Sequence, residues 1–522
     1  MAGKQKVVVL GSGAAGVTAA LAAATGGAQV TLLEAAECFG GTTALSGVGC
    51  WVPASRWTRA AGIQDSSEKA LEYLQAIALG DVDMPLIKAY LAESDYSFGR
   101  VEDTSPVRWQ YVPIPDYQAD YPGGLAAGRS IEPDRVTVSA ETRKVIRQTP
   151  YGLPSITFCE ELYAGDKLDH EEIFSREAKG ILARGRGYVG ALIDTLHDLG
   201  GITRLGARGT KLTLCDGTVT GVEMGGQKLE GSVILACGGF DRDPALVKAF
   251  LRSPVLSPAG PPTLRGDAVR MSMAAGAALG CMSEAWWSPA VKVAGAEIDG
   301  APFYRQLFCE CGLPGGIVVD GNGRRFVNEG SNYNDIGRSI QQFDAGEFRF
   351  QPIWLICDAE RRALHKKLRS AEPDDAIYGV RWDITADSIT ALAARIEIDS
   401  TVLEATIARY NSMVEAGADR DYGRGSHVFD SFAALHLPQR PLGEGPYYAL
   451  QIEIGALGTK GGPRIDRLGR VLSQESGNPI EGLFAAGNAA CSPFGFAYPG
   501  AGATIGPAIH FGWMAGETAA AG

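Results

Sequence analysis

The chain has 522 residues, of which 45% are hydrophobic and 21% charged, so it is long enough for two or three globular domains with a sizeable core. Its net charge of −12, without any basic block, argues against a nucleic-acid partner. The ten cysteines are scattered and form no C-x-x-C pair, so we expect free thiols in a reducing compartment and no metal site.

A glycine-rich turn follows the first predicted strand. Residues 7–10 read VVVL and lead into a G-x-G-x-x-G pattern formed by Gly11, Gly13 and Gly16, and a helix is predicted to follow. The first glycine permits the tight bend, the second lets a pyrophosphate approach the backbone, and the third lets helix and strand pack closely. Since the positive end of the helix dipole would face the phosphate, the pattern predicts a dinucleotide site.

The region after this turn extends the predicted nucleotide site. A second strand ends at Glu34, whose carboxylate can accept hydrogen bonds from an adenosine ribose. The loop at 38–47 reads CFGGTTALSG, and its small, hydroxylated residues favour a ligand cradle. The short N-terminal segment enters the first strand without a signal peptide, and no run of eighteen apolar residues occurs. We therefore expect a cytoplasmic protein without stable membrane insertion.

The middle of the chain differs from its two ends in predicted secondary structure and loop length. Helical spacing at 57–105 predicts two helices joined at Gly80, and a proline-rich loop follows at 112–124. An apolar strand then ends in ACGGF, which contains Gly238. Between the tryptophans near 286 and Pro441 the loops become longer, and helices are predicted at 359–368 and 401–416. We expect a discontinuous nucleotide-binding domain (1–286 and 442–522) with an inserted substrate domain (287–441).

Several motifs together resemble one superfamily. They are GGTTALSG, ACGGF, RGDAVRM, GRRFVNE and GLFAAGN, in addition to the glycine-rich turn. The chain is similar to FAD flavoproteins of the fumarate reductase and succinate dehydrogenase superfamily. The strongest likeness is to the 3-ketosteroid Δ1-dehydrogenases, carried by residues 34–47, by GTKGGP at 458–463 and above all by YPGAGATIGPA at 498–508. The tail departs from fumarate reductases, because apolar residues at 492–498 replace the expected arginine.

The resemblance implies an α/β fold: a Rossmann-like FAD-binding domain of the GR2 type with an inserted α+β domain. It implies an enzyme that introduces a C=C bond beside a ring ketone, by removing a proton from the α-carbon and transferring a hydride to flavin N5. Such chemistry requires stabilisation of an enolate. The resemblance assigns this role to the Tyr498 hydroxyl and to the backbone N–H of Gly502, close to the start of the final helix.

The resemblance also assigns the proton acceptor to Tyr333, assisted by Tyr117 in a Pro-Asp-Tyr loop. A free phenol with a pKa near 10 is a poor base at neutral pH, so Tyr333 needs a hydrogen-bonding partner. Asp116 and Tyr121 compete with Tyr117 for the assisting role, because the loop aligns only approximately. His510 in the final helix is expected to be a structural residue.

The expected FAD contacts are small residues and short donors from both ends of the chain. They are Gly11, Ser12, Gly13, Ala15, Gly16, Glu34, Thr42, Thr43, Ser46, Gly238, Gly487, Asn488, Gly502 and Ile505. No histidine adjoins the loop at 38–47, so we expect FAD to be bound non-covalently. The electron acceptor is not identified by the sequence.

Four functions remain open. The best match is 3-ketosteroid 1,2-dehydrogenation. The same chemistry on a small oxocyclohexane carboxylate is an alternative, in which one of several arginines would hold the carboxylate: Arg100, Arg129, Arg135 or Arg143. A fumarate-reductase-like ene reductase is the third, disfavoured by the missing arginine. The fourth is a flavin-binding module without turnover, which the set of candidate phenols disfavours.

Overall fold

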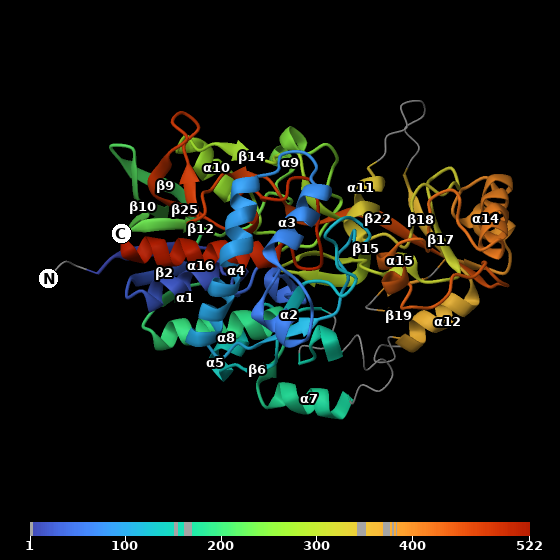
Figure 1. The fold of residues 1–522 in the computed structure, drawn as a ribbon, viewed down its shortest axis with the longest axis horizontal. Coiled ribbons are helices and arrows are strands. Elements are labelled where there is room, and N and C mark those ends of the chain that lie inside the picture. The colour runs from blue at the N-terminus through green and yellow to red at the C-terminus, as the bar shows by residue number, and fades with distance from the viewer. Residues whose placement is uncertain are drawn as a thin grey trace.

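The computed structural model describes residues 4–150, 155–160, 170–341, 351–368, 376–377, 380–382 and 384–522. The described chain forms an elongated molecule built around two sheets (Figure 1). The two termini lie at the same end of the molecule, and helices α12 (Ala359–Leu368) and α14 (Ser400–Glu415) lie at the opposite end. These two helices match the ranges predicted from the sequence.

The first sheet carries the glycine-rich turn. Its strand order is β24-β25-β12-β1-β2-β8, and all neighbouring pairs are parallel except β24 with β25. The bounds are β24 Arg470–Leu472, β25 Pro479–Ala485, β12 Ser232–Leu235, β1 Lys6–Leu10, β2 Gln29–Leu33 and β8 Ile202–Arg204. Because the carboxyl ends of β1, β12 and β25 share one edge, the segments that follow them meet there.

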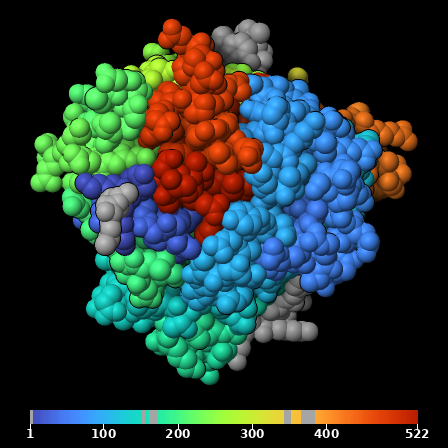
Figure 2. All heavy atoms as spheres, turned by 60° about the vertical axis from the view of Figure 1, so that its left-hand side comes forward, coloured from blue at the N-terminus to red at the C-terminus, as the bar shows by residue number. Residues whose placement is uncertain are grey.

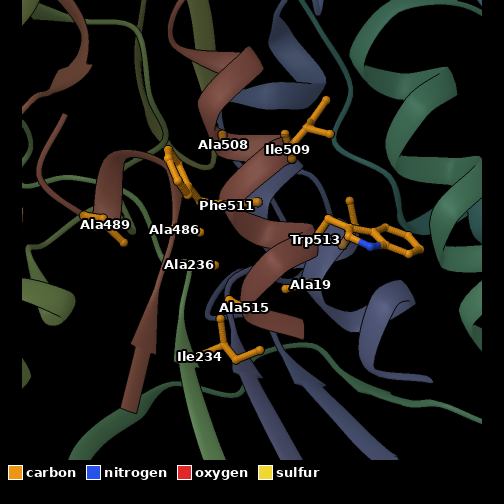
Figure 3. Packing of buried hydrophobic residues seen from close by; sticks show 14 of the residues in the cluster. Ala19, Ile234, Ala236, Ala486, Ala489, Ala508, Ile509, Phe511, Trp513 and Ala515 are labelled. Carbon is orange, nitrogen blue, oxygen red and sulfur yellow. The ribbon is translucent and has the colours of Figure 1, made fainter. Parts of the chain in front are cut away.

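Two helices made largely of small residues pack closely on this sheet, α1 (Ala14–Thr25) and α16 (Ile505–Ala521). A Cβ atom at Gly516 would lie 2.2 Å from the Ala19 carbonyl oxygen, so the contact requires glycine. Figure 3 shows Phe511 and Ala515 of α16 on the side facing the sheet, with Trp513 on the other side. This packing joins the end of the chain to its beginning.

The second sheet has the order β16-β15-β22-β18-β17, with β13 and β21 also paired to β22. Its strands are β13 Ser257–Pro258, β15 Ala285–Ile298, β16 Ala301–Gln306, β17 Gly316–Val319, β18 Ile353–Cys357, β21 Ile384–Ala386 and β22 Tyr447–Thr459. Strands β13 and β22 thus extend this sheet outside the predicted range 287–441. Those domain boundaries stay a prediction.

Helices from the first third of the chain flank the C-terminal segments. Helices α3 (Ser67–Ala76) and α4 (Met84–Thr104) are separated at Gly80, as the sequence predicts. Figure 2 shows residues 60–105, in light blue, beside the red C-terminal residues on one face. Helix α11 (Tyr333–Ser339) lies on β15, where a Cβ atom at Gly337 would lie 2.5 Å from the Ser288 nitrogen.

The remaining elements are short or peripheral. The helices are α2 Arg56–Ala60, α5 Ala140–Val145, α7 His170–Ala178, α8 Arg184–Asp198, α9 Pro244–Phe250, α10 Asp267–Ala274, α13 Ile389–Arg395, α15 Val428–Ala433 and the 3-10 turns Thr43–Leu45, Glu310–Gly312 and Gly487–Ala489. The strands are β3 Cys50–Trp51, β4 Trp109–Val112, β5 Ser130–Pro133, β6 Val136–Thr137, β7 Ile181–Leu182, β9 Gly209–Cys215, β10 Thr218–Met224, β11 Gln227–Glu230, β14 Leu279–Gly280, β19 Ala376–Ile377, β20 Val380–Arg381 and β23 Gly462–Pro463. Among the described residues, no helix combines the length and apolarity needed to cross a membrane.

Candidate active site

The glycine-rich turn has the shape that a pyrophosphate requires. Gly11 has φ +99°, and a Cβ atom there would lie 2.5 Å from the Ala236 carbonyl oxygen. At Gly16 a Cβ atom would lie 1.8 Å from the Gly11 oxygen. A Cβ atom at Gly13, by contrast, would meet its nearest neighbour, Thr43 Oγ1, at 3.4 Å. The space in front of the α1 N-terminus is therefore left open, which fits a phosphate group.

The loop at 38–47 folds back on this turn. The backbone N–H of Ala14 donates to Thr43 Oγ1 over 2.9 Å, and Ser46 Oγ donates to the Thr43 carbonyl oxygen over 2.8 Å. Gly40 and Gly41 both have positive φ, +112° and +48°. The loop thus brings Thr43 into contact with α1, with Ser46 bonded to Thr43, where the sequence predicts a cradle.

Glu34 is nearly buried beneath the turn. Its Oε2 accepts hydrogen bonds from the Ser12 backbone N–H at 3.0 Å and from Ser12 Oγ at 2.6 Å, and its Oε1 accepts one from the Ala36 N–H. In this arrangement the carboxylate holds the turn and the following loop together. Its contact with a ribose stays a prediction.

The other predicted FAD contacts come from the end of the chain. A Cβ atom at Gly487 would lie 3.0 Å from the Ala15 Cβ, so the first and last nucleotide motifs touch. Asn488 Oδ1 accepts a hydrogen bond from Trp286 Nε1 over 3.0 Å. Ile505 is the first residue of α16. A small cavity of about 20 Å³ lies here, lined by Trp286, Lys460, Ile465, Gly487, Asn488, Ala490, Cys491, Ser492, Pro493, Ala503, Thr504, Pro507, Ala508 and Phe511.

Gly238 also has a left-handed backbone, with φ +76°. A Cβ atom there would lie 2.5 Å from the Leu264 Cδ2. Together the glycine-rich turn at the α1 N-terminus and the C-terminal glycine beside it fit a dinucleotide that runs from the turn toward the C-terminal segment. The individual contacts of these residues with FAD stay predictions.

Three phenols from distant parts of the sequence form one buried cluster. Tyr117, Tyr333 and Tyr498 are 6%, 7% and 2% exposed. The Tyr333 hydroxyl donates to the Tyr498 hydroxyl over 2.6 Å. The Tyr117 ring centroid lies 5.5 Å from that of Tyr333 and 5.1 Å from that of Tyr498. The structure therefore brings together the three side chains for which the sequence predicts catalytic roles.

Gly502 lies beside this cluster, one short turn before α16. It has φ +91°, and a Cβ atom there would lie 2.1 Å from the Gly49 carbonyl oxygen. Both facts require glycine at this position. The Gly502 backbone lies close enough to the Tyr498 hydroxyl to lower its pKa, so the two predicted donors are neighbours.

Burial controls the protonation of the cluster. It raises the pKa of Tyr498, while hydrogen bonds with Tyr333, Thr504 and the Gly502 backbone lower it. Burial and the neighbouring phenols raise the pKa of Tyr333 well above 10. Burial likewise raises the pKa of Tyr117, against a lowering hydrogen bond with Tyr333. All three groups are therefore neutral phenols at physiological pH, able to donate hydrogen bonds.

The two competitors of Tyr117 occupy different surroundings. Tyr121 is 51% exposed. Asp116 is fully buried, where its carboxylate pairs with Arg129 and accepts a hydrogen bond from Trp51 Nε1 over 2.8 Å. Burial raises the pKa of Asp116 to about 6, although Arg129 and Trp51 oppose this. The geometry thus favours Tyr117, whose assisting role stays a prediction.

The arginines considered for a substrate carboxylate already have partners. Arg129 is fully buried between Asp65 and Asp116, and its guanidinium forms ion pairs with both carboxylates. Arg135 pairs with Glu160 over 2.7 Å. Arg100 lies 3.9 Å from Asp103, and Arg143 Nη1 donates to the Glu177 carbonyl oxygen. The structure gives no contact between these arginines and the phenol cluster within its described residues.

Several neighbours of the phenols were not predicted. Trp286 packs against Tyr498 with ring centroids 4.8 Å apart, Phe308 against Tyr333 at 5.0 Å, and Phe429 against Tyr117 at 5.0 Å. No motif marks these aromatic residues, because their role arises only from tertiary packing. Lys460 lies in the motif GTKGGP at 458–463, but that motif does not indicate a role for its side chain.

His510 is buried in α16, where its Nδ1 lies 2.9 Å from Ser97 Oγ. Burial lowers its pKa to about 3, so the imidazole is neutral. These facts agree with the predicted structural role.

One group of possible metal ligands lies outside the phenol cluster. The ligand atoms of Asp81, Cys281 and Cys491 lie within 4.8 Å of one another. Arg464 Nη2 lies 2.5 Å from Asp81 Oδ2, so the carboxylate is already paired with a cation. This pairing disfavours a bound metal at these residues. The absence of a metal site in the protein stays a prediction.

The profile of the FAD binding domain family matches residues 6–505. The chain belongs to this FAD-binding family. Relatives of this FAD-binding chain include a 4-oxocyclohexanecarboxylate 2-dehydrogenase of Sinomonas cyclohexanicum, 35% identical over 542 residues that cover 98% of this chain and 92% of the relative. A 3-oxosteroid 1-dehydrogenase of Mycobacterium tuberculosis is 32% identical, with 98% and 97% covered.

Solved structures give the same result. A 3-ketosteroid Δ1-dehydrogenase of Sterolibacterium denitrificans superimposes with a TM-score of 0.88 at 30% identity, covering 99% of this FAD-binding chain and 100% of that chain. A flavocytochrome c3 fumarate reductase shares the fold, with a TM-score of 0.68 and 21% identity over 100% of this chain and 78% of that chain. These comparisons confirm the predicted family resemblance, the α/β fold class and an FAD-dependent oxidoreductase.

Proposed function

We propose that this flavoprotein desaturates a ring ketone, removing a proton from the α-carbon and a hydride from the next carbon. The observation that carries the proposal is the buried Tyr333–Tyr498 hydroxyl pair with Gly502 beside it. When bound, FAD supplies the acceptor for the hydride. The other tasks fall to residues of this chain.

Tyr498 and Gly502 are proposed to bind the ketone oxygen. Their O–H and N–H groups lie side by side, so both can point at one carbonyl oxygen. Negative charge grows on that oxygen as the α-proton leaves, and a well-placed donor stabilises such charge by about 3 kcal/mol. Burial strengthens the effect, because water does not compete for the oxygen.

Tyr333 is proposed to accept the α-proton through a relay. As its oxygen takes this proton, its own hydroxyl hydrogen moves to Tyr498, and the Tyr498 hydrogen moves to the ketone oxygen. The substrate C–H bond breaks and an enol forms without any free phenolate, which burial disfavours. The hydride then passes to FAD, and the enol proton returns along the Tyr498 and Tyr333 hydroxyls while Tyr333 releases one proton, which leaves a ketone with a new C=C bond. Tyr117, whose ring centroid lies 5.5 Å from that of Tyr333, is proposed to assist it.

The best-matched substrate class is a 3-ketosteroid, dehydrogenated between carbons 1 and 2. A small cyclic ketone such as an oxocyclohexane carboxylate is the second candidate, because the 35% identical relative bears the name of an enzyme for that class. An ene reductase is the third, and the lack of an arginine at 492–498 disfavours it. We expect non-covalent FAD, since no histidine adjoins the loop at 38–47.

Anaerobic flavin bleaching tests the proposal. The holoenzyme is mixed with a 3-ketosteroid or with 4-oxocyclohexanecarboxylate, and absorbance of oxidised flavin is followed. Bleaching by either ketone, with formation of the matching enone, supports desaturation and identifies the substrate class. Absence of bleaching by all cyclic ketones, together with reoxidation of reduced flavin by an enone, would establish the ene reductase instead.

A further inference from the structure

Lys460 is a fully buried lysine beside Trp286, the tryptophan that packs against Tyr498. It follows the last residue of β22, and its backbone is fixed on both sides. Its N–H donates to the Glu284 carbonyl oxygen over 2.9 Å, and its carbonyl oxygen accepts from the Ser492 N–H over 2.9 Å. A buried ammonium normally costs several kcal/mol unless it is paired, so its contacts require an explanation.

The ammonium group binds the backbone that leads to Tyr498. Lys460 Nζ donates to three consecutive carbonyl oxygens, those of Gly495 at 3.2 Å, Phe496 at 3.0 Å and Ala497 at 2.8 Å. A lysine ammonium has three donors, and all three go to this segment. Three successive carbonyls are thereby turned toward one point, which fixes the peptide immediately before the tyrosine.

The same ammonium lies 4.2 Å from the ring centroid of Trp286. That ring packs against Tyr498 at 4.8 Å and donates its Nε1–H to Asn488. A cation over an indole face is an attractive contact, stronger when it is shielded from water. Lys460 therefore supports Tyr498 from two directions, through the preceding backbone and through the indole that contacts its ring.

Within the part of the chain that the structure describes, no carboxylate forms an ion pair with Lys460. Arg338 and Asp335 of α11 and the Cys281 thiol act on it electrostatically, and burial with Arg338 disfavours its charged form. Arg338 Nη1 also donates to the Phe496 carbonyl oxygen, over 3.1 Å. Lys460 and Arg338 thus both donate to one short segment of backbone, and Lys460 is the one that is fully buried.

We propose that Lys460 is a positioning residue that holds Tyr498 where its hydroxyl meets the ketone oxygen, acting through residues 495–497 and Trp286. This inference rests on the proposed function. It predicts that Lys460 affects the rate of the chemical step more than substrate binding, and that it does so only when the Tyr498 hydroxyl is present.

The test is a double-mutant cycle on the FAD-loaded enzyme. Lys460→Met keeps the length of the side chain and removes the charge and the three donors. It is combined with Tyr498→Phe, and Lys292→Met on the exposed face of β15 is the matched control. The rate of flavin reduction at saturating ketone, the ketone KM, FAD content and Tm are measured for each variant.

We expect Lys460→Met to lower the reduction rate about 30-fold in the parent, with KM within about threefold. In the Tyr498→Phe background the same change should alter the rate by less than about threefold. Equal losses in both backgrounds would overturn the inference while leaving the proposed function intact. No bleaching by any ketone in the parent would instead reject the proposed function.

A second variant covers the case in which Lys460→Met does not fold. Lys460→Arg keeps a cation and several donors, so a positioning role predicts partial recovery of the reduction rate with FAD bound. Loss of FAD or of folding in both variants would show that Lys460 has a general structural role, which overturns the inference.

Discussion

Tyr333 and Tyr498 lie 165 residues apart in the sequence, and their hydroxyl oxygens lie 2.6 Å apart in the structure. The first residue begins α11, which lies on the second sheet, and the second residue comes just before α16, which packs on the first. The site is therefore assembled only when both sheets are in place. Each of its hydroxyl groups has a separate expected effect on turnover.

Replacing Tyr498 by Phe should lower the rate of flavin reduction by about 100-fold or more, because one buried donor to the ketone oxygen is lost. FAD content should stay unchanged, since the aromatic packing against Trp286 is kept. Stopped-flow absorbance with a bleaching ketone measures the rate. A variant that reduces its flavin at the parent rate would show that the hydroxyl does not bind the reacting oxygen.

Replacing Tyr333 by Phe should lower the reduction rate by about 10²–10⁴-fold, the usual effect of losing a general base. Tyr117→Phe should have a smaller effect, because Tyr117 is proposed only to assist Tyr333 and its ring packing against Tyr333 is kept. Tyr121→Phe is the control, since Tyr121 is half exposed and should reduce its flavin normally. A larger loss in Tyr121→Phe than in Tyr117→Phe would reverse this assignment.

Gly13→Ala should weaken FAD binding while leaving the apoprotein stable. The added methyl group meets Thr43 Oγ1 at 3.4 Å, an ordinary contact, but it occupies the space predicted for the pyrophosphate. Gly16→Ala is the contrasting variant, because its methyl group would lie 1.8 Å from the Gly11 oxygen and should lower the Tm itself. FAD titration and thermal melting of the two apoproteins separate these effects. Full FAD affinity in Gly13→Ala would place the pyrophosphate elsewhere.

His510 should make the protein less stable in acid. Burial lowers its pKa in the folded state to about 3, whereas the unfolded chain binds the proton near pH 6.5. Unfolding therefore takes up a proton between these values, so the stability present above pH 6.5 falls by about 1.4 kcal/mol per unit as the pH drops toward 3. Urea unfolding at several pH values measures the slope, and His510→Gln should show a smaller one. Equal slopes would mean that other groups cause the acid sensitivity.

The sequence predicted the parts of the site that depend on local constraints. The spacing of Gly11, Gly13 and Gly16 predicts the nucleotide-binding turn, because a tight turn and close packing permit few other residues at these positions. Tyr498 and Gly502 lie in one long motif, so their proximity was also expected. Tyr333 and Tyr117 followed from a family resemblance, and the structure brings both to Tyr498.

The remaining features depend on contacts between distant segments. Nothing local marks Trp286 or Phe429 as neighbours of the phenols, since an aromatic residue in a strand or a short helix is usually just core. The carboxylate of Glu34 was expected at a ribose, but it also holds Ser12 and Ala36. Arg129 was considered for a substrate, yet Asp65 and Asp116 enclose it, which the sequence could not reveal.

Phe308 offers a practical route to altered specificity. Its ring packs on Tyr333, while 46% of the residue is exposed, so it forms part of the outer rim of the cluster. Gly502 permits no side chain, and the phenol hydroxyls are proposed to take part in the chemistry. Directed evolution toward wider or narrower ring ketones should therefore begin with a small library at position 308. Substitutions there change the shape of the rim without removing a group proposed to take part in the chemistry.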